Sequence, residues 1–134
     1  MATKIFVNLP VKNLDASKTF FGKLGYSFNP QYTDETAACM VVSEDISVML
    51  LTHPKFKEFT SKAICDAKKS TEVLTCLLCE DKKQVDEIVR KAVAAGGSTY
   101  AEPKDYGCMY QHSFEDLDGH QWEYIAMNGT PPQK

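Results

Sequence analysis

The chain has 134 residues, of which 43% are hydrophobic and 25% charged, and its formal net charge at pH 7 is -3. This length suits one folded domain whose core needs neither a disulfide nor a metal. An acidic balance without a cluster of Lys or Arg argues against binding to nucleic acid or to an anionic membrane. No apolar run approaches the roughly 20 residues that span a bilayer, and the opening residues lack the apolar segment of a signal peptide. We therefore expect a cytoplasmic protein.

The first half of the chain predicts a strand, a helix and three more strands. Residues 4–9 alternate, with Ile5, Val7 and Leu9 on one face and Phe6 and Asn8 on the other. Asn13 or Asp15 can cap a helix that ends at Gly25. Polar breaks then separate three strand-like stretches, at 26–32, 36–43 and 46–52.

Residues 53–70 interrupt this pattern. They are rich in Lys, contain two Phe and show no clear periodicity. They could form a linker, a lid over a ligand site or a frayed helix. His53 opens this segment, where an exposed loop histidine is the simplest interpretation.

The second half repeats the same order of elements. Residues 72–79 indicate a strand, and 82–95 an amphipathic helix that stops at Gly96-Gly97. Strands are predicted near 98–102, 108–115 and 120–126. The sequence therefore predicts one α+β domain over residues 1–134, built from βαβββ modules at about 4–52 and 71–127. We expect each module to form an antiparallel sheet with its helix on one face, and the other two faces to pair as a curled cup.

The segment Asp116-Leu117-Asp118-Gly119 has the composition of a turn between two antiparallel strands. A loop of residues 116–119 pairs Glu115 with His120 and places His112 opposite Glu123. A bulge would bring Ser113 to that position instead. Alternation puts Trp122 and Tyr124 on the other face from Glu123, beneath a helix. His120 follows the turn, and we expect it to be exposed and structural.

Five cysteines occur at positions 39, 65, 76, 79 and 108. Cys76 and Cys79 have the C-x-x-C spacing of redox and zinc motifs. They lie within an apolar strand, however, where residues three apart point to opposite faces. We therefore expect reduced thiols without a redox or zinc role.

Three segments of the sequence together resemble one known superfamily. They are VNLPVKNLDASKTFFGKLGYSF, ETAACMVVSEDISVMLLT and HSFEDLDGHQWEYI. In this order, and with the repeated βαβββ pattern, they resemble the vicinal oxygen chelate superfamily of glyoxalases, bleomycin resistance proteins and extradiol dioxygenases. The resemblance runs from about Ile5 to Met127 and implies the fold described above. Such members commonly form homodimers, for which Phe28 and Tyr32 are candidate interface residues.

Metal-dependent members of this superfamily place four ligands in the cup, from the first and last strand of each module. The resemblance assigns these positions to Phe6, Leu50, Leu74 and Glu123. Only Glu123 can bind a metal, so we expect no metal centre of the usual kind and no other cofactor. A weak site made by Asn8, His112 and Glu123 remains an alternative.

These positions lead to two functional hypotheses. In the first, the protein binds a small, partly hydrophobic molecule without a metal, on a floor formed by Phe6, Asn8, Leu50 and Leu74. Tyr106 and Tyr110, near the mouth of the cup, could add contacts. In the second, the protein is a glyoxalase-like lyase that uses Glu123 as a base, assisted by His112; a dioxygenase is less favoured. A purely structural pairing of Glu123 also remains open.

Overall fold

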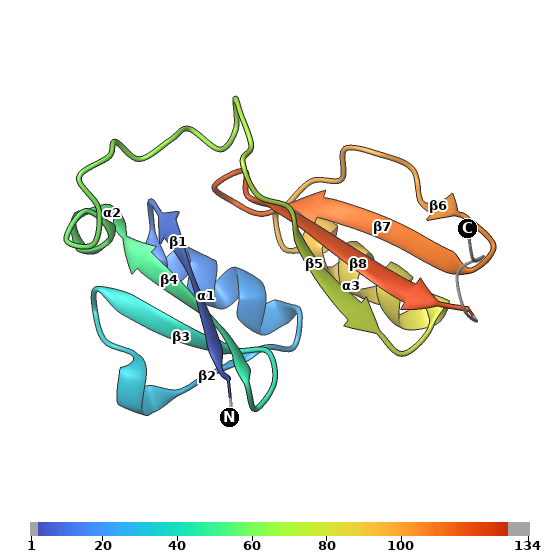
Figure 1. The fold of residues 1–134 in the computed structure, drawn as a ribbon, viewed down its shortest axis with the longest axis horizontal. Coiled ribbons are helices and arrows are strands. Elements are labelled where there is room, and N and C mark those ends of the chain that lie inside the picture. Colours follow the sequence, from blue (N-terminus) through green and yellow to red (C-terminus); the bar gives the residue numbers. More distant parts are fainter. Residues whose placement is uncertain (1–2, 129–134) are drawn as a thin grey trace. The chain divides into compact units, whose positions relative to one another are not determined.

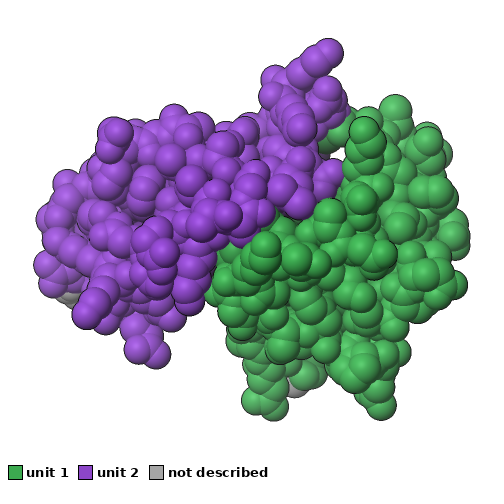
Figure 2. All heavy atoms as spheres, turned by 180° about the vertical axis from the view of Figure 1, so that it is seen from behind, with its two compact units in different colours: residues 1–65 green, residues 66–134 purple. Residues whose placement is uncertain are grey.

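The computed structural model describes residues 3–128 (Figure 1). The chain divides into two compact units, Met1–Cys65 and Asp66–Lys134 (Figure 2). The boundary falls inside the segment predicted to connect the two modules. Within the described residues, no helix is both long enough and apolar enough to cross a membrane.

Unit 1 contains one four-stranded sheet and its helices. The strands have the order β1-β4-β3-β2. The elements are β1 (Ile5–Val11), α1 (Leu14–Lys23), β2 (Ser27–Phe28), the 3-10 helix η1 (Pro30–Tyr32), β3 (Ala37–Val41), β4 (Ile46–Thr52) and α2 (His53–Phe56).

The helix α1 forms where its capping and apolar residues predict it. The Asn13 side chain accepts a hydrogen bond from the backbone N–H of Ala16 at 3.0 Å, which satisfies one of the free donors at the helix start. Phe20 and Phe21 are fully buried and meet edge to face, with ring centroids 4.9 Å apart. Gly25 has a φ of 108°, which lets the chain turn sharply after the helix.

The predicted strand over 26–32 is much shorter in the structure. Only Ser27–Phe28 pairs with β3, and the 3-10 helix η1 follows. Pro30 explains the change, because it has no backbone N–H to donate to a neighbouring strand. The Asn29 side chain then caps the turn by accepting from the backbone N–H of Gln31 at 2.9 Å.

Unit 2 repeats the arrangement of unit 1, with the strand order β5-β8-β7-β6. Asp81 caps its helix by accepting from the backbone N–H of Gln84 at 2.8 Å. The elements are β5 (Thr75–Cys79), α3 (Lys82–Ala94), β6 (Lys104–Asp105), β7 (Met109–Glu115) and β8 (Gln121–Met127).

The strand predicted at 98–102 does not form. Ser98 makes a single bridge to Glu115, and the short strand β6 comes later in the chain. The Thr99 hydroxyl donates to the Ser113 carbonyl oxygen at 2.8 Å, so a side chain takes the place of a continuing backbone ladder. Pro103 has no backbone N–H and cannot extend such a ladder.

The α+β class and the two βαβββ modules are confirmed, but the sheets are mixed rather than wholly antiparallel. The first strand of each module runs parallel to the last one, β1 beside β4 and β5 beside β8. The remaining pairs are antiparallel. Parallel neighbours need a long crossover, and here the helix and the two middle strands provide it. The joining of the two sheets into one cup stays a prediction.

Each unit has its own core between its sheet and its helix (Figure 1). In unit 1 the fully buried side chains include Phe20, Phe21, Met40, Val48 and Leu50. In unit 2 they include Val85, Phe114, Trp122 and Tyr124. Phe114 stacks on Trp122 and Tyr124, with centroids 6.3 and 5.7 Å away. The prediction that Trp122 and Tyr124 pack under a helix is therefore confirmed.

Candidate functional site

The register of β7 and β8 decides which residues share the face of Glu123. Ser113 pairs with Glu123, and His112 pairs with Tyr124. The predicted pairing of His112 with Glu123 is therefore wrong by one residue, and Ser113, the alternative, takes the position. The loop is longer than expected because Glu115 pairs with Gln121, which leaves residues 116–120 to make the turn.

Asp116 explains why the loop includes His120. Its backbone N–H donates to the His120 carbonyl at 3.0 Å, and its side chain accepts from the His120 N–H at 3.0 Å. The same carboxylate accepts from Trp122 Nε1 at 3.0 Å and from the Asp118 N–H at 2.9 Å. Burial raises the pKa of Asp116, while the charge of His120 and these hydrogen bonds oppose the rise. His120 thus belongs to the framework of the turn.

The face of the unit 2 sheet turned away from the Trp122 core is here called the Glu123 face. Glu123 is half-buried on it. Gln111 Nε2 donates to Glu123 Oε2 at 2.7 Å, along the diagonal between neighbouring strands. By alternation from Glu123, the residues of this face are Cys76, Leu78, Gln111, Ser113, Glu123 and Ile125.

Tyr100 is a further neighbour of Glu123. Burial raises the pKa of Tyr100, a hydrogen bond from Ser113 lowers it, and the carboxylates of Glu123 and Glu115 raise it further. Tyr100 is still 43% exposed. Sequence reasoning missed both Tyr100 and Gln111. Alternation in the observed register identifies Gln111, whereas the strand predicted over 98–102 gives no sign that Tyr100 lies near Glu123.

Cys76 pairs with Glu123 from the neighbouring strand β5. Burial and the charge of Glu123 raise the pKa of Cys76, so its thiol stays protonated at neutral pH. Burial also raises the pKa of Cys79 to about 11, with further contributions from Asp81 and Cys76. Cys79 pairs with Ala126 and lies on the other face, as predicted, and all five cysteines are free.

His112 and Tyr110 lie on the face opposite Glu123. The Nδ1 atom of His112 is buried and has no hydrogen-bond partner within the described part of the chain. The Tyr110 hydroxyl donates to Asp86 Oδ1 of α3 at 2.6 Å, and this bond raises the pKa of Tyr110 to about 12. Neither side chain can act beside Glu123 on this sheet, which corrects their expected placement. Tyr106 is exposed in the loop between β6 and β7.

In unit 1, Phe6 and Asn8 share one face, as predicted, and Phe6 is 52% exposed. Their partners on β4 are Ser47 and Met49. Leu50 instead pairs with Leu9 and Ala38, on the other face, and is 0% exposed. The prediction that Leu50 shares a floor with Phe6 is therefore wrong.

Register also identifies which residues of the two units correspond. Asn8 pairs with Met49 in unit 1, and Cys76 pairs with Glu123 in unit 2. Asn8 therefore corresponds to Cys76, and Met49 corresponds to Glu123. Leu74 lies two residues before Cys76, outside β5, and is 50% exposed. The position expected for Leu74 beside Glu123 thus belongs to Cys76.

The donors on the Glu123 face do not suit a hard divalent metal. Such ions need several oxygen or imidazole ligands. Here one Glu123 oxygen already accepts from Gln111, Cys76 is a protonated thiol, and His112 lies on the opposite face. Within residues 3–128, no three His, Cys, Asp or Glu side chains gather in a group that could hold a metal. The alternative site that combined His112 with Glu123 is therefore not supported.

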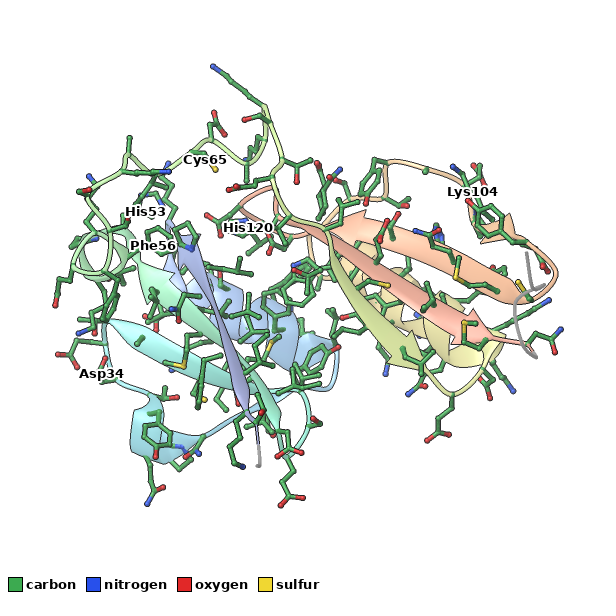
Figure 3. All side chains as sticks on the ribbon, in the orientation of Figure 1. Asp34, His53, Phe56, Cys65, Lys104 and His120 are labelled. Atoms are coloured by element: carbon green, nitrogen blue, oxygen red, sulfur yellow. The ribbon has the colours of Figure 1, made fainter. Side chains whose placement is uncertain are left out.

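The segment after β4 begins as a short helix. His53 is the first residue of α2, and the Thr52 hydroxyl accepts from the Lys55 N–H at 3.4 Å to cap it. His53 and Phe56 come from this helix, whereas His120 comes from the β7–β8 loop (Figure 3). Neither histidine is on the Glu123 face.

Comparison with known proteins agrees with this fold. The family model described as "Bleomycin resistance protein-like N-terminal" matches residues 3–43. The hypothetical protein SA1046 from S. aureus is 27% identical, with a TM-score of 0.79 over 94% of this chain and 95% of that one. The likeness to this family lies in the first module, while the structural likeness to SA1046 spans nearly the whole chain.

Two further structures support the fold assignment. A glyoxalase-related enzyme from Fulvimarina pelagi is 17% identical, with a TM-score of 0.78 over 94% of this chain and 88% of that one. A fosfomycin resistance protein from Listeria monocytogenes is 17% identical, with a TM-score of 0.68 over 100% of this chain and 96% of that one. No curated protein matches the chain. Identities this low show the fold, so the activity of this protein has to be argued from its own residues.

Proposed function

We propose that this protein binds a small, partly hydrophobic organic molecule on the Glu123 face of unit 2, without a divalent metal. The observation that carries the proposal is the hydrogen bond from Gln111 to Glu123. It fixes a carboxylate on a sheet face instead of leaving it free to turn into solvent. A few fixed polar groups among apolar side chains are typical of small-molecule sites.

The apolar surroundings of this polar pair support the proposal. Leu78, on the Glu123 face, is 68% exposed, and Leu74 just before β5 is 50% exposed. Exposed apolar side chains that form a contiguous patch commonly mark an interaction site.

A fragment screen followed by ligand-observed NMR tests this proposal. We expect several apolar fragments with a polar group to bind, equally well with and without EDTA. Glu123→Gln should weaken the hits, while Glu80→Gln, which removes an exposed carboxylate elsewhere, should leave them unchanged. Hits that disappear with EDTA, or near-stoichiometric metal in protein purified without chelators, would contradict the metal-free proposal.

A glyoxalase-like lyase is the second candidate, because one Glu123 oxygen stays available. Glu123 Oε2 accepts from Gln111, while Oε1 has no hydrogen bond within residues 3–128 and could take a proton from a bound substrate. His112 cannot assist from the same face. Incubation with a hemithioacetal distinguishes the candidates: turnover lost in Glu123→Gln supports the lyase, and binding without turnover supports the binding protein.

A further inference from the structure

We infer that the ligand of the Glu123 face is an organic cation, with a protonated amine beside an apolar ring or chain. The inference rests on the proposed function and names the class of its ligand. Three independent features of the face support it: free acceptor atoms, unbalanced negative charge and an exposed aromatic ring.

The pair of Gln111 and Glu123 leaves two oxygen atoms free to accept hydrogen bonds within residues 3–128. Gln111 must direct its amide nitrogen toward Glu123, because a carboxylate oxygen can only accept. Glu123 Oε1 and Gln111 Oε1 then have no donor within the described residues. A protonated amine carries up to three N–H donors, so it can satisfy both oxygens at once.

The charge around Glu123 is negative. No ion pair within residues 3–128 involves Glu123. Its neighbours Cys76 and Tyr100 are neutral at pH 7, and the two charges acting on Tyr100 are the carboxylates of Glu123 and Glu115. A half-buried carboxylate without a cation has lost part of its hydration, and a cationic ligand would offset that loss.

The apolar part of such a ligand also has partners here. Leu78 and Leu74 offer exposed aliphatic surface. The exposed ring of Tyr100 can contact either an apolar group or the cation itself, since the face of an aromatic ring attracts positive charge. The cationic group of the ligand thus matches the acceptor oxygens of the face, and its apolar part matches the exposed apolar side chains.

Three probes of one shape test the inference: 1-naphthylmethylamine, 1-naphthalenemethanol and 1-naphthoate, titrated at pH 7 and followed by NMR. They are cationic, neutral and anionic respectively. We expect the amine to bind about tenfold or more tightly than the alcohol, because hydrogen bonds to a charged group are the stronger ones. Glu123→Gln should abolish this preference by weakening the binding of the amine far more than that of the alcohol, and Glu80→Gln should keep the preference.

A second variant protects the test against loss of fold. Gln111→Met removes one acceptor oxygen but keeps Glu123, so it should reduce the preference for the amine without abolishing it. Equal or tighter binding of the alcohol or of naphthoate overturns the cation inference and leaves the proposed function standing. An amine preference that survives Glu123→Gln also overturns it. If none of the probes binds at millimolar concentration, both the inference and the proposed function fail.

Discussion

The amide nitrogen of Gln111 lies 2.7 Å from Glu123 Oε2, across two antiparallel strands of unit 2. The two residues are not directly opposite, since Ser113 holds that place, so the bond runs along the sheet diagonal. It orients the carboxylate and leaves one of its oxygens without a donor in residues 3–128. The proposed binding site depends on this pair.

Replacing Gln111 with Leu should weaken ligand binding without unfolding the protein. The variant keeps Glu123 but removes the donor that orients it, and a lost hydrogen bond to a charged group costs about 1.5–3 kcal/mol at most. We expect roughly tenfold lower affinity for a fragment hit, measured by NMR titration. Gln31→Leu, an exposed change in unit 1, is the matched control. Unaltered affinity in Gln111→Leu would show that the orientation of Glu123 is irrelevant to binding.

Gly119→Ala should destabilise the protein by about 1–3 kcal/mol. Gly119 has a φ of 91°, and an added Cβ would lie 2.8 Å from the backbone nitrogen of Lys68. Gly22→Ala is the control, because that glycine lies inside α1 and a Cβ there meets nothing within 4 Å. It should be neutral or stabilising. Thermal and urea unfolding measure both, and equal stability of the two variants would contradict the contact at Lys68.

The stability that the Tyr110 hydroxyl contributes to the fold should be lost at alkaline pH. Its hydrogen bond to Asp86 raises the pKa of Tyr110 to about 12, above the usual 10.0. A raised pKa favours the protonated form in the folded state, so the contribution is complete below pH 10 and is lost between pH 10 and 12. The stability difference between wild type and Tyr110→Phe should therefore shrink over that range. A difference that is constant up to pH 12 would argue against the bond, and Tyr106→Phe, exposed, serves as control.

Cysteine alkylation at pH 8 should distinguish Cys65 from Cys76. Both residues are exposed, but burial of the thiol and the charge of Glu123 raise the pKa of Cys76. Since the thiolate is the reactive form, iodoacetamide should modify Cys65 faster. Glu123→Gln should reduce the difference between the two alkylation rates, because it removes one cause of the raised pKa of Cys76. Mass spectrometry of samples taken at several times measures the two alkylation rates. Faster labelling of Cys76 than of Cys65 would contradict the prediction.

Local patterns predicted most of the fold. The caps at Asn13 and Asp81, together with the apolar stripes that follow them, place both long helices correctly. Alternation also assigned Phe6 and Asn8 to one face, and Trp122 with Tyr124 to the core. Each of these predictions depends only on neighbours in the sequence.

The errors concern register and pairing between distant strands. The turn motif alone predicts that His112 lies beside Glu123, because the motif does not show that Asp116 bonds both backbone groups of His120. A slip of one residue moves a side chain to the other face. Leu50 was misplaced for a similar reason, since its partners Leu9 and Ala38 come from strands whose pairing is set by the tertiary fold. The sequence thus predicts Glu123 as a site residue, but it does not predict which residues surround Glu123.

The most direct test of the Glu123 face is an amide chemical-shift map of a fragment hit, recorded for wild type and Glu123→Gln with their melting temperatures. If the face binds ligand, the shifts should cluster at Gln111, Ser113 and Glu123, and the variant should lose roughly ten- to a hundredfold in affinity. Its melting temperature should change little, since glutamine keeps the shape of the side chain. Shifts that cluster away from these strands, or a variant that is less stable but binds equally well, would contradict the account.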